Sequence, residues 1–325
     1  MVEHHHNDAL LPYMVGGLLY TPATNTGVAE KIKNGRIPCL TSIALCLEDA
    51  VLDEALEYAE GCLKNTVSEL AKLDKEKLPM IFARVRTPIH LLHIHELLGE
   101  NEQALTGYVL PKFDPENAEE YAKLISQFNG SRTEKLYIMP IIESGTAADI
   151  SHRTETLLEI KAVLDKIKEY VLNVRVGGND FSSLYGLRRS VSQNIYEIGV
   201  IRDILSDIIN VFASDHVVSG AVWEYFGTDM DADWAKGLKR ELELDKLNGF
   251  IGKTAIHPSQ LPIIYESMKP SRADYDDARS ILSWNDGQSG VAKSADSSRM
   301  NEIKCHKKWA ERIVRLAEVY GIRDE

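Results

Sequence analysis

Two carboxylates in this sequence stand after apolar, β-rich runs, in positions suited to binding a divalent cation. Glu143 follows "LYIMPII", and Asp180 follows "LNVRV" across a Gly-Gly-Asn stretch. If the two runs are neighbouring parallel strands, both side chains lie at the same end of the sheet. Mg2+ binds oxygen ligands, typically one or two carboxylates together with waters and substrate oxygens. The pair therefore predicts a magnesium site, with an ordinary strand-to-helix turn as the alternative.

Other charged residues follow neighbouring apolar runs in the same way. They are Glu48 and Asp49 in "CLEDAV", Arg84 and Arg86 in "ARVRTP", Lys112 in "LPKF" and His257 in "TAIHPSQ". Each has a structural alternative, since an acid suits the first turn of a helix and an arginine suits an ion pair. Their occurrence at the ends of several strands predicts that they converge on one active site.

Two glycines and two lysines bear on the chemistry of that site. Gly177 and Gly178 have no Cβ, so we expect a bound ligand to approach the backbone closely there. Lys112 and Lys253 are candidates for a Schiff-base mechanism. The paired carboxylates favour metal chemistry over that alternative.

These residues need elements to place them, and the sequence predicts alternating strands and helices. Short β-rich runs alternate with charged stretches whose apolar residues recur every three or four positions, as in 53–73 and 153–170. Such alternation predicts parallel pairing through helical crossovers, and the number of strands favours an α/β fold, a (β/α)8 TIM barrel. The expected strands are 17–21, 43–47, 80–85, 106–110, 136–142, 172–176, 217–223 and 252–256.

The residues after the last expected strand predict a C-terminal helical appendage. We expect the barrel domain to span 1–258 and the helical extension to span 259–325. A polar, Gly/Ser-rich loop over 285–302 is expected to be mobile and to act as a lid on its own or a neighbour's barrel mouth. The last helix is amphipathic, and its apolar stripe needs a cover, which favours a homo-oligomer.

Composition limits the classes of partner. The chain has 325 residues and a formal net charge of −12, which argues against a nucleic-acid partner because phosphate binding needs basic patches. No apolar run reaches the roughly 18 residues of a membrane span, and the N-terminal residues lack the apolar core of a secretion signal. The four cysteines show no C-x-x-C spacing, so we expect a cytoplasmic protein without a membrane partner. His4, His5 and His6 are interpreted as a polar terminus or a tag remnant rather than a metal site.

Several motifs occur in an order that resembles a known family. They are "LEDAV" (47–51), "ARVR" (83–86), "LPK" (110–112), the Glu that ends the fifth run, "GGND" (177–180) and "GKTAIHPSQ" (252–260). In these motifs the chain is similar to the citrate-lyase beta-subunit-like group of TIM-barrel carbon–carbon lyases, in the aldolase/citrate lyase superfamily. Malyl-CoA lyases are relatives of this group. The first and last motifs together are fairly specific, whereas a G-x-x-D pattern alone is weak.

The resemblance implies a Mg2+-dependent lyase. Its substrate would be a small carboxylate or an acyl-CoA, with coenzyme A then part of the substrate, and cleavage would be of the aldol or Claisen type through an enolate. The resemblance assigns Glu143 and Asp180 as metal ligands and Arg84 as the clamp on a substrate carboxylate or enolate oxygen. Glu48 and Asp49 would hold metal-bound waters and orient Arg84. A trimer or hexamer is the expected assembly.

The same resemblance leaves the substrate and the proton-transfer group open. Besides Arg84, the expected substrate-binding residues are Arg86, Lys112, Gly177, Gly178 and His257. Arg86 replaces the family's usual Asn, which suggests a more anionic substrate such as a phosphate, and Asn179 replaces a Glu. Relatives supply an acid from a C-terminal segment, so the general acid/base is Asp296, Glu302 or His257. The alternatives to a lyase are a thioesterase that uses the same site and a non-catalytic metabolite-binding barrel.

Overall fold

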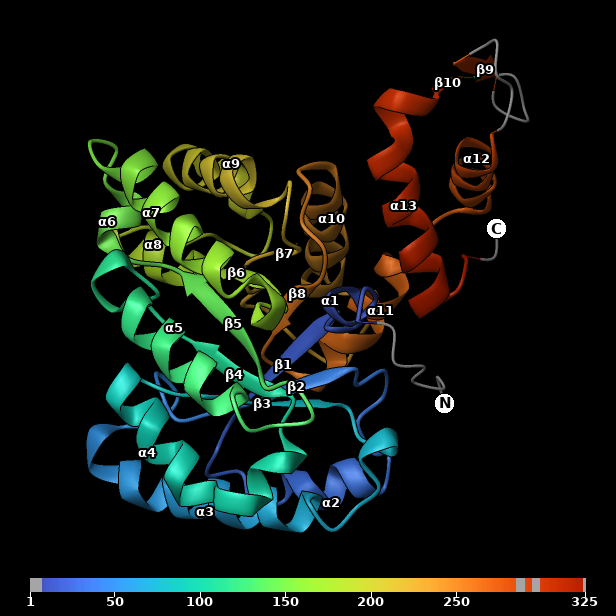
Figure 1. Ribbon diagram of the computed structural model, residues 1–325. Helices are drawn as coiled ribbons and strands as arrows, with labels where there is room; N and C mark the ends of the chain where they lie inside the picture. Colours follow the sequence, from blue (N-terminus) through green and yellow to red (C-terminus); the bar gives the residue numbers. More distant parts are fainter. Residues whose placement is uncertain (1–7, 285–289, 294–298, 324–325) are drawn as a thin grey trace.

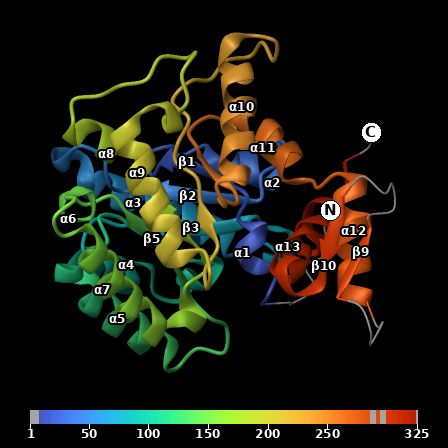
Figure 2. The same cartoon turned by 90° about the horizontal axis from the view of Figure 1, so that it is seen from above.

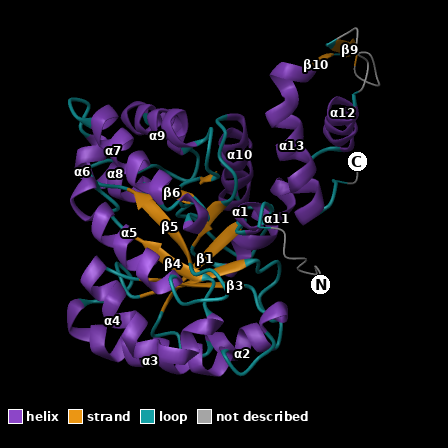
Figure 3. Cartoon of the chain, viewed as in Figure 1, coloured by secondary structure: helices purple, strands orange, loops and turns teal. Residues whose placement is uncertain are grey.

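A barrel of parallel strands forms the centre of the protein. The structure is a computed structural model that describes residues 8–284, 290–293 and 299–323. The barrel strands are β1 (Gly17–Pro22), β2 (Ser42–Cys46), β3 (Met80–Arg84), β4 (Gly107–Leu110), β5 (Tyr137–Ile142), β6 (Val174–Val176), β7 (Val218–Ser219) and β8 (Lys253–Ala255). From β1 to β7 each strand pairs with the next in chain order, and β1 also pairs with β8, with Leu18 opposite Thr254. A parallel bridge between Gly220 and Lys253 joins β7 to β8 and nearly closes the ring, which confirms the predicted (β/α)8 barrel (Figure 3).

A helix follows each strand and covers the outside of the barrel (Figure 1). In chain order these helices are α2 (Val28–Lys33), α3 (Leu56–Leu70), α4 (Pro88–Leu98), α5 (Pro115–Asn129), α7 (Arg153–Lys166), α9 (Gly199–Phe212), α10 (Asp233–Leu247) and α11 (Leu261–Met268). Their starts have clear local causes. For example, the Asp114 side chain accepts a hydrogen bond from Glu116 N, and Pro115 occupies the first helical position. Short helices α1 (Leu11–Met14), α6 (Gly145–Ala148) and α8 (Gly178–Leu184) complete the barrel part.

The strands bury both of their faces. Side chains that point outward, such as Ile43, Ile81 and Val174, pack against the helix ring in the larger apolar core. Side chains that point inward from the first five strands fill the barrel with apolar groups, including Phe82 and Met139. The floor of the barrel is therefore packed, and an open site is left at the C-terminal ends of the strands.

Two helices outside the ring pack against each other beside the barrel (Figures 1 and 2). These are α12 (Arg272–Ser283) and α13 (Ile303–Tyr320), and a small hairpin of β9 (Val291–Lys293) and β10 (Met300–Glu302) precedes α13. Ala278 and Ile281 of α12 cover Ala310 of α13. The end of α13 reaches the barrel, where the Tyr320 hydroxyl donates to Tyr13 O at 2.7 Å. The apolar stripe of α13 is thus partly covered within the chain, with Trp309 and Ile313 left half-buried.

The N-terminal histidines and the membrane-span criterion were both considered from the sequence. His4, His5 and His6 lie outside the described residues. Within the described ranges, the helices lack the combination of length and apolarity that a bilayer crossing requires.

Candidate active site

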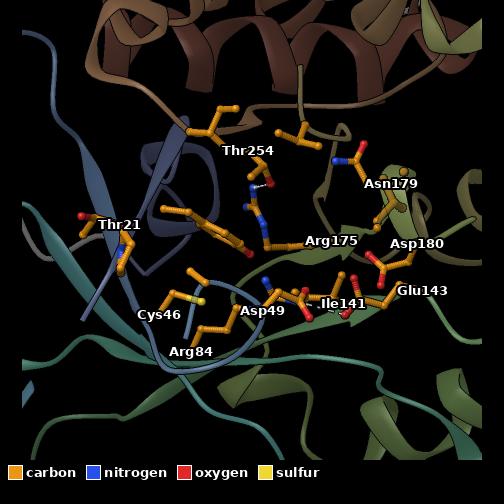
Figure 4. A pocket seen from close by; sticks show the side chains of 18 residues that line it. Thr21, Cys46, Asp49, Arg84, Ile141, Glu143, Arg175, Asn179, Asp180 and Thr254 are labelled. Carbon is orange, nitrogen blue, oxygen red and sulfur yellow. Dashed lines mark hydrogen bonds and ion pairs between the residues drawn. The ribbon is translucent and has the colours of Figure 1, made fainter. Parts of the chain in front are cut away.

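A cavity of about 370 Å3 opens at the C-terminal ends of the barrel strands. The predicted residues Asp49, Arg84, Glu143 and Asp180 all line it (Figure 4). Because β2, β3, β5 and β6 end at the same rim, residues far apart in the sequence come together there. The structure therefore brings the core of the predicted site into one pocket.

Arg84 is held by three carboxylates at the rim. Its Nη2 atom lies 2.7 Å from Glu48 Oε2 and 3.3 Å from Asp49 Oδ2. The same atom lies 3.4 Å from Glu143 Oε1. Burial alone would lower the pKa of Arg84, but the surrounding negative charges raise it above its ordinary value. Arg84 is therefore fixed in place and always charged, and its Nε has no hydrogen-bond partner in the described part of the chain.

Glu143 is a buried carboxylate close to a second one. Its side chain is 2% exposed, and its Oε1 accepts a hydrogen bond from Lys112 N at 2.9 Å. The pKa of Glu143 is raised to about 8, chiefly by burial; Arg84 opposes this rise, and the neighbouring charge of Asp180 adds to it. A cation placed beside both carboxylates would offset the repulsion between them.

The donor set suits a hard divalent cation. Glu143 and Asp180 offer carboxylate oxygens only, and no group of three or more His, Cys, Asp and Glu residues in the described ranges is placed to hold a metal. An ion here would keep open positions for water and substrate, which is the usual coordination of Mg2+ in enzymes. The residues present therefore fit the magnesium ion that the sequence predicts.

Glu48 lies behind the rim and links Arg84 to Lys112. Its Oε1 accepts from Lys112 Nζ at 2.7 Å, and its Oε2 accepts from Asp49 N at 2.8 Å. Burial raises the pKa of Glu48. Partial burial of Asp49 also acts upward, but the hydrogen bond with Glu48 and the charges of Arg84 and Lys112 lower its pKa overall. Glu48 and Lys112 do not themselves line the cavity, so their role is to hold Arg84 and Asp49.

Two other predicted residues are engaged away from the cavity. Arg86 donates from Nε to Leu47 O at 2.7 Å and from Nη2 to Val51 O at 2.6 Å, so it braces the loop after β2. The His257 side chain caps the 3-10 helix Pro258–Gln260 and stacks on Phe226, with ring centroids 4.5 Å apart. Neither residue lines the cavity: Arg86 is engaged by the loop after β2, and His257 Nδ1 accepts from Ser259 N at 3.2 Å.

Lys253 points away from the barrel interior. Its Nζ lies 2.9 Å from Glu241 Oε1 and 2.7 Å from Asp245 Oδ2, and both carboxylates belong to α10. The side chain is fully buried in this network. A lysine in such a network has no route to a substrate carbonyl in the cavity, so the geometry disfavours it as a Schiff-base residue.

The two glycines line the cavity, but protein atoms fill the room beside them. A Cβ on Gly177 would lie 2.2 Å from Glu143 Oε2 and 2.3 Å from Glu143 Cβ. A Cβ on Gly178 would lie 2.7 Å from both Ala221 Cβ and Ile195 Cδ1. The close approach that we expected for a ligand is thus made by side chains of the protein, and Gly177 leaves the space that Glu143 occupies.

The cavity residues that the sequence analysis missed include Tyr20, Arg175 and Thr254. Arg175 is 1% exposed and donates from Nη2 to Thr254 Oγ1 at 2.8 Å. These side chains point inward from the middle of β1, β6 and β8 rather than following the strands. A signal was present in "LNVRV", where Asn173 and Arg175 alternate with apolar residues on one face of the strand.

Glu302, one of the two C-terminal candidates for the proton-transfer group, lies away from this mouth. Glu302 ends β10, and the hairpin sits at the outer end of α13 (Figures 1 and 2). Arg299 binds the hairpin to α12 through ion pairs of 3.0 Å to Asp274 and 2.6 Å to Asp277. Glu302 therefore does not reach its own barrel's cavity, and Asp296 lies outside the described residues.

Comparisons with known proteins agree with this architecture. The family described as C-C bond lyase of the TIM-barrel fold matches residues 9–322. L-malyl-CoA/beta-methylmalyl-CoA lyase from Cereibacter sphaeroides is 25% identical over 317 residues, which cover 93% of this chain and 94% of that protein. CitE from Mycobacterium tuberculosis, in complex with magnesium, acetoacetate and coenzyme A, superposes with a TM-score of 0.62 at 20% identity, over 93% of this chain and 97% of that chain. A citrate lyase from Burkholderia xenovorans LB400 superposes with a TM-score of 0.66 at 15% identity, over 95% and 93% of the two chains.

The family match spans nearly the whole described chain, including the cavity and the two outer helices. The structural likenesses, at low identity, support the barrel fold. The resemblance inferred from the sequence motifs is thereby confirmed, and the chain belongs to the family of C-C bond lyases of the TIM-barrel fold.

Proposed function

We propose that this protein cleaves a carbon–carbon bond in a small carboxylated or acyl-CoA substrate, with Mg2+ held by Glu143 and Asp180. The observation that carries the proposal is the pair of neighbouring carboxylates in a pocket that Arg84 also lines. The family match supports the lyase chemistry. The malyl-CoA lyase relative and the CitE complex with magnesium, acetoacetate and coenzyme A support the choice of metal and substrate class.

In the proposed reaction, Arg84 would stabilise negative charge, and Glu48 and Asp49 would orient Arg84. When bound, Mg2+ would polarise the carbonyl next to the breaking bond and stabilise the negative charge that develops there. Arg84 lines the cavity and presents a fixed positive charge to a substrate oxygen there. Glu48 and Asp49 keep the guanidinium oriented, so little reorganisation is needed during the reaction.

The proton-transfer group remains a prediction among Asp296, Glu302 and His257. Since Glu302 stands away from its own barrel mouth, its use requires the hairpin of another copy. A trimer or hexamer in which each hairpin covers a neighbouring mouth would meet that requirement. Light scattering at micromolar concentration tests the assembly, and a monomer that retains full activity would leave the barrel's own residues as the source.

The test of the function is metal-dependent product release. A panel of 3-hydroxyacyl-CoA thioesters and hydroxy acids is incubated with Mg2+ or with EDTA, and glyoxylate, pyruvate and acetyl-CoA are measured. The proposal expects a keto acid and an acyl-CoA or acid together, whereas a thioesterase would release free coenzyme A and the intact hydroxy acid, with no keto acid. Glu143→Gln should abolish Mg2+ binding by calorimetry and product release, while the exposed Glu120→Gln serves as the matched control. Parental Mg2+ binding in Glu143→Gln would refute the metal assignment.

A further inference from the structure

One half of the barrel interior is polar. The inward positions of β1 to β5 carry mainly apolar side chains, whereas Asn173, Arg175, Ser219 and Thr254 face inward from the remaining strands. These four residues are joined by hydrogen bonds of 2.7 Å from Asn173 to Ser219, 2.8 Å from Arg175 to Thr254 and 3.3 Å from Arg175 to Asn173. The upper part of this half, at Arg175 and Thr254, lines the cavity.

Arg175 is a buried cation without a carboxylate partner in the described part of the chain. It is 1% exposed, it interacts with the neutral side chains of Thr254, Asn173 and Tyr20, and its Nε has no hydrogen-bond partner. Burial of a guanidinium is costly unless a counter-charge compensates it. Arg84, by contrast, has three carboxylates within ion-pair distance. The charge of Arg175 can therefore be compensated by an anionic ligand that enters the cavity.

The surroundings of Arg175 suit an oxyanion. Figure 4 shows its guanidinium directed toward Thr254 and away from Glu143 and Asp180, so the positive charge and the metal-binding carboxylates face different parts of the pocket. Tyr20 also lines the cavity, and its ring lies under the Arg84 guanidinium, 5.3 Å from Cζ. Burial raises the pKa of Tyr20 despite both arginines, so its hydroxyl stays neutral and can donate a hydrogen bond.

We propose that Arg175, with Thr254 and Tyr20, binds a second anionic group of the substrate, so that the enzyme acts on molecules with an oxyanion remote from the metal-bound end. This inference rests on the proposed function, since it places the reacting end at Glu143 and Asp180. A carboxylate or a phosphate fits the planar, forked donor set of an arginine. A substrate with one charged end would leave Arg175 uncompensated in the complex, which costs affinity.

The test compares ligands that share one end and differ at the other. Oxaloacetate and 4-methyl-2-oxopentanoate have the same 2-oxo acid end and nearly the same shape, but only oxaloacetate carries a second carboxylate. 3-Phosphonopyruvate carries a phosphonate there instead. Binding of each is measured by calorimetry in Mg2+ for the parent, for Arg175→Met and Arg175→Gln, and for the exposed control Arg202→Met on α9. The tighter of the two dianions identifies the favoured oxyanion.

The parent and the Arg202→Met control are expected to bind a dianion at least about tenfold more tightly than the uncharged-tail analogue. In Arg175→Met and Arg175→Gln that preference should fall to about one, while Mg2+ binding without ligand stays at the parental level. A preference that survives in both variants, or one that is absent from the parent, overturns the inference. Failure of the parent to bind Mg2+ would instead refute the proposed function, and the dianion preference can then still be measured without metal.

The unliganded melting temperature separates ligand binding from a purely structural role. If Arg175 serves a ligand, its replacement by Met removes an uncompensated buried charge, and the melting temperature should stay level or rise. If Arg175 serves the barrel core, the melting temperature should fall in both variants. A fall accompanied by an unchanged ligand preference would count against the proposal.

Discussion

The space beside Gly177 allows a sharp test of how Glu143 is placed. The backbone of Gly177 has φ −95° and ψ 80°, so alanine meets no left-handed strain there. Its Cβ, however, would lie 2.3 Å from Glu143 Cβ and 2.2 Å from Glu143 Oε2. Non-bonded carbons make favourable contacts only at roughly 3.5 Å or more, so the backbone at Gly177 and the backbone at Glu143 must move apart by more than about 1 Å. Since Glu143 Cβ is bonded directly to the backbone, no side-chain rotation relieves the clash.

From these distances we expect Gly177→Ala to weaken Mg2+ binding and turnover by about 100-fold, which is the effect expected of a 1 Å misplacement at a catalytic site. The cost in folding free energy should be about 1–3 kcal/mol, as for other overpacked sites. Calorimetric titration with Mg2+ measures the first quantity, and chemical denaturation measures the second.

The matched control is Gly145→Ala, two residues after Glu143. A Cβ at Gly145 would meet no atom within 4 Å, so this variant should keep parental Mg2+ affinity and stability. Parental affinity in Gly177→Ala, or an equal loss in both variants, would show that the glycine does not set the position of Glu143.

Three further changes follow from the same structure. Arg84→Lys keeps the charge but loses the planar fork, so steady-state kinetics should show at least about a tenfold loss in kcat/KM with an unchanged circular dichroism spectrum, and parental kinetics would contradict the role of Arg84. Lys253→Met leaves Asp245 buried without its cation and Glu241 with Arg189 alone, so denaturation should show a loss of about 3–5 kcal/mol, and a stable variant would contradict this network. Burial and the charges of nearby lysines lower the pKa of His216 from 6.5. Protonation of His216 therefore favours the unfolded state. The stability that the neutral imidazole contributes is present above pH 6.5 and is lost as the pH falls below it. The melting temperature of His216→Gln should therefore fall less between pH 7.5 and pH 5.5 than that of the parent. An equal fall would exclude His216 as the cause of the parent's loss of stability at low pH.

The strands were predictable because their apolar runs are separated by long helical patterns. The ends of the observed strand differ most from the expected ones at β7, where pairing is confined to Val218–Ser219 although the expected strand covered 217–223. Beyond Gly220 the chain leaves the sheet, and Trp223 Nε1 donates to Trp234 O at 3.0 Å at the start of α10. The hydrophobic pattern of residues 221–223 thus reflects packing against a helix, which a single sequence does not distinguish from strand pairing.

The site was predictable where a side chain directly follows its strand and less so elsewhere. Arg84 ends β3 and Glu143 directly follows β5, so the strand sets the direction of each side chain, and the rule that active sites lie at the carboxyl ends of barrel strands places them. Arg86 lies farther along its loop, and the direction of its side chain depends on which loop carbonyls come near, which spacing alone does not reveal. Arg175 was missed because it lies within a strand, where only the phase of the strand tells inside from outside.

The contact between Tyr320 and Tyr13 bears on how the protein is made. The two residues are 307 positions apart, and β1 has β8 as one of its two neighbours. During synthesis β1 is made first, but the edge of β1 that pairs with β8 stays unpaired until β8 has been synthesised. The contact of Tyr13 with Tyr320 forms only after α13 has been synthesised. Contacts of such long range close slowly, and an open strand edge is prone to pair with other chains. The nascent chain is therefore expected to need protection by chaperones for almost its entire translation, and ribosome stalling before β8 should yield aggregation rather than a partly folded barrel.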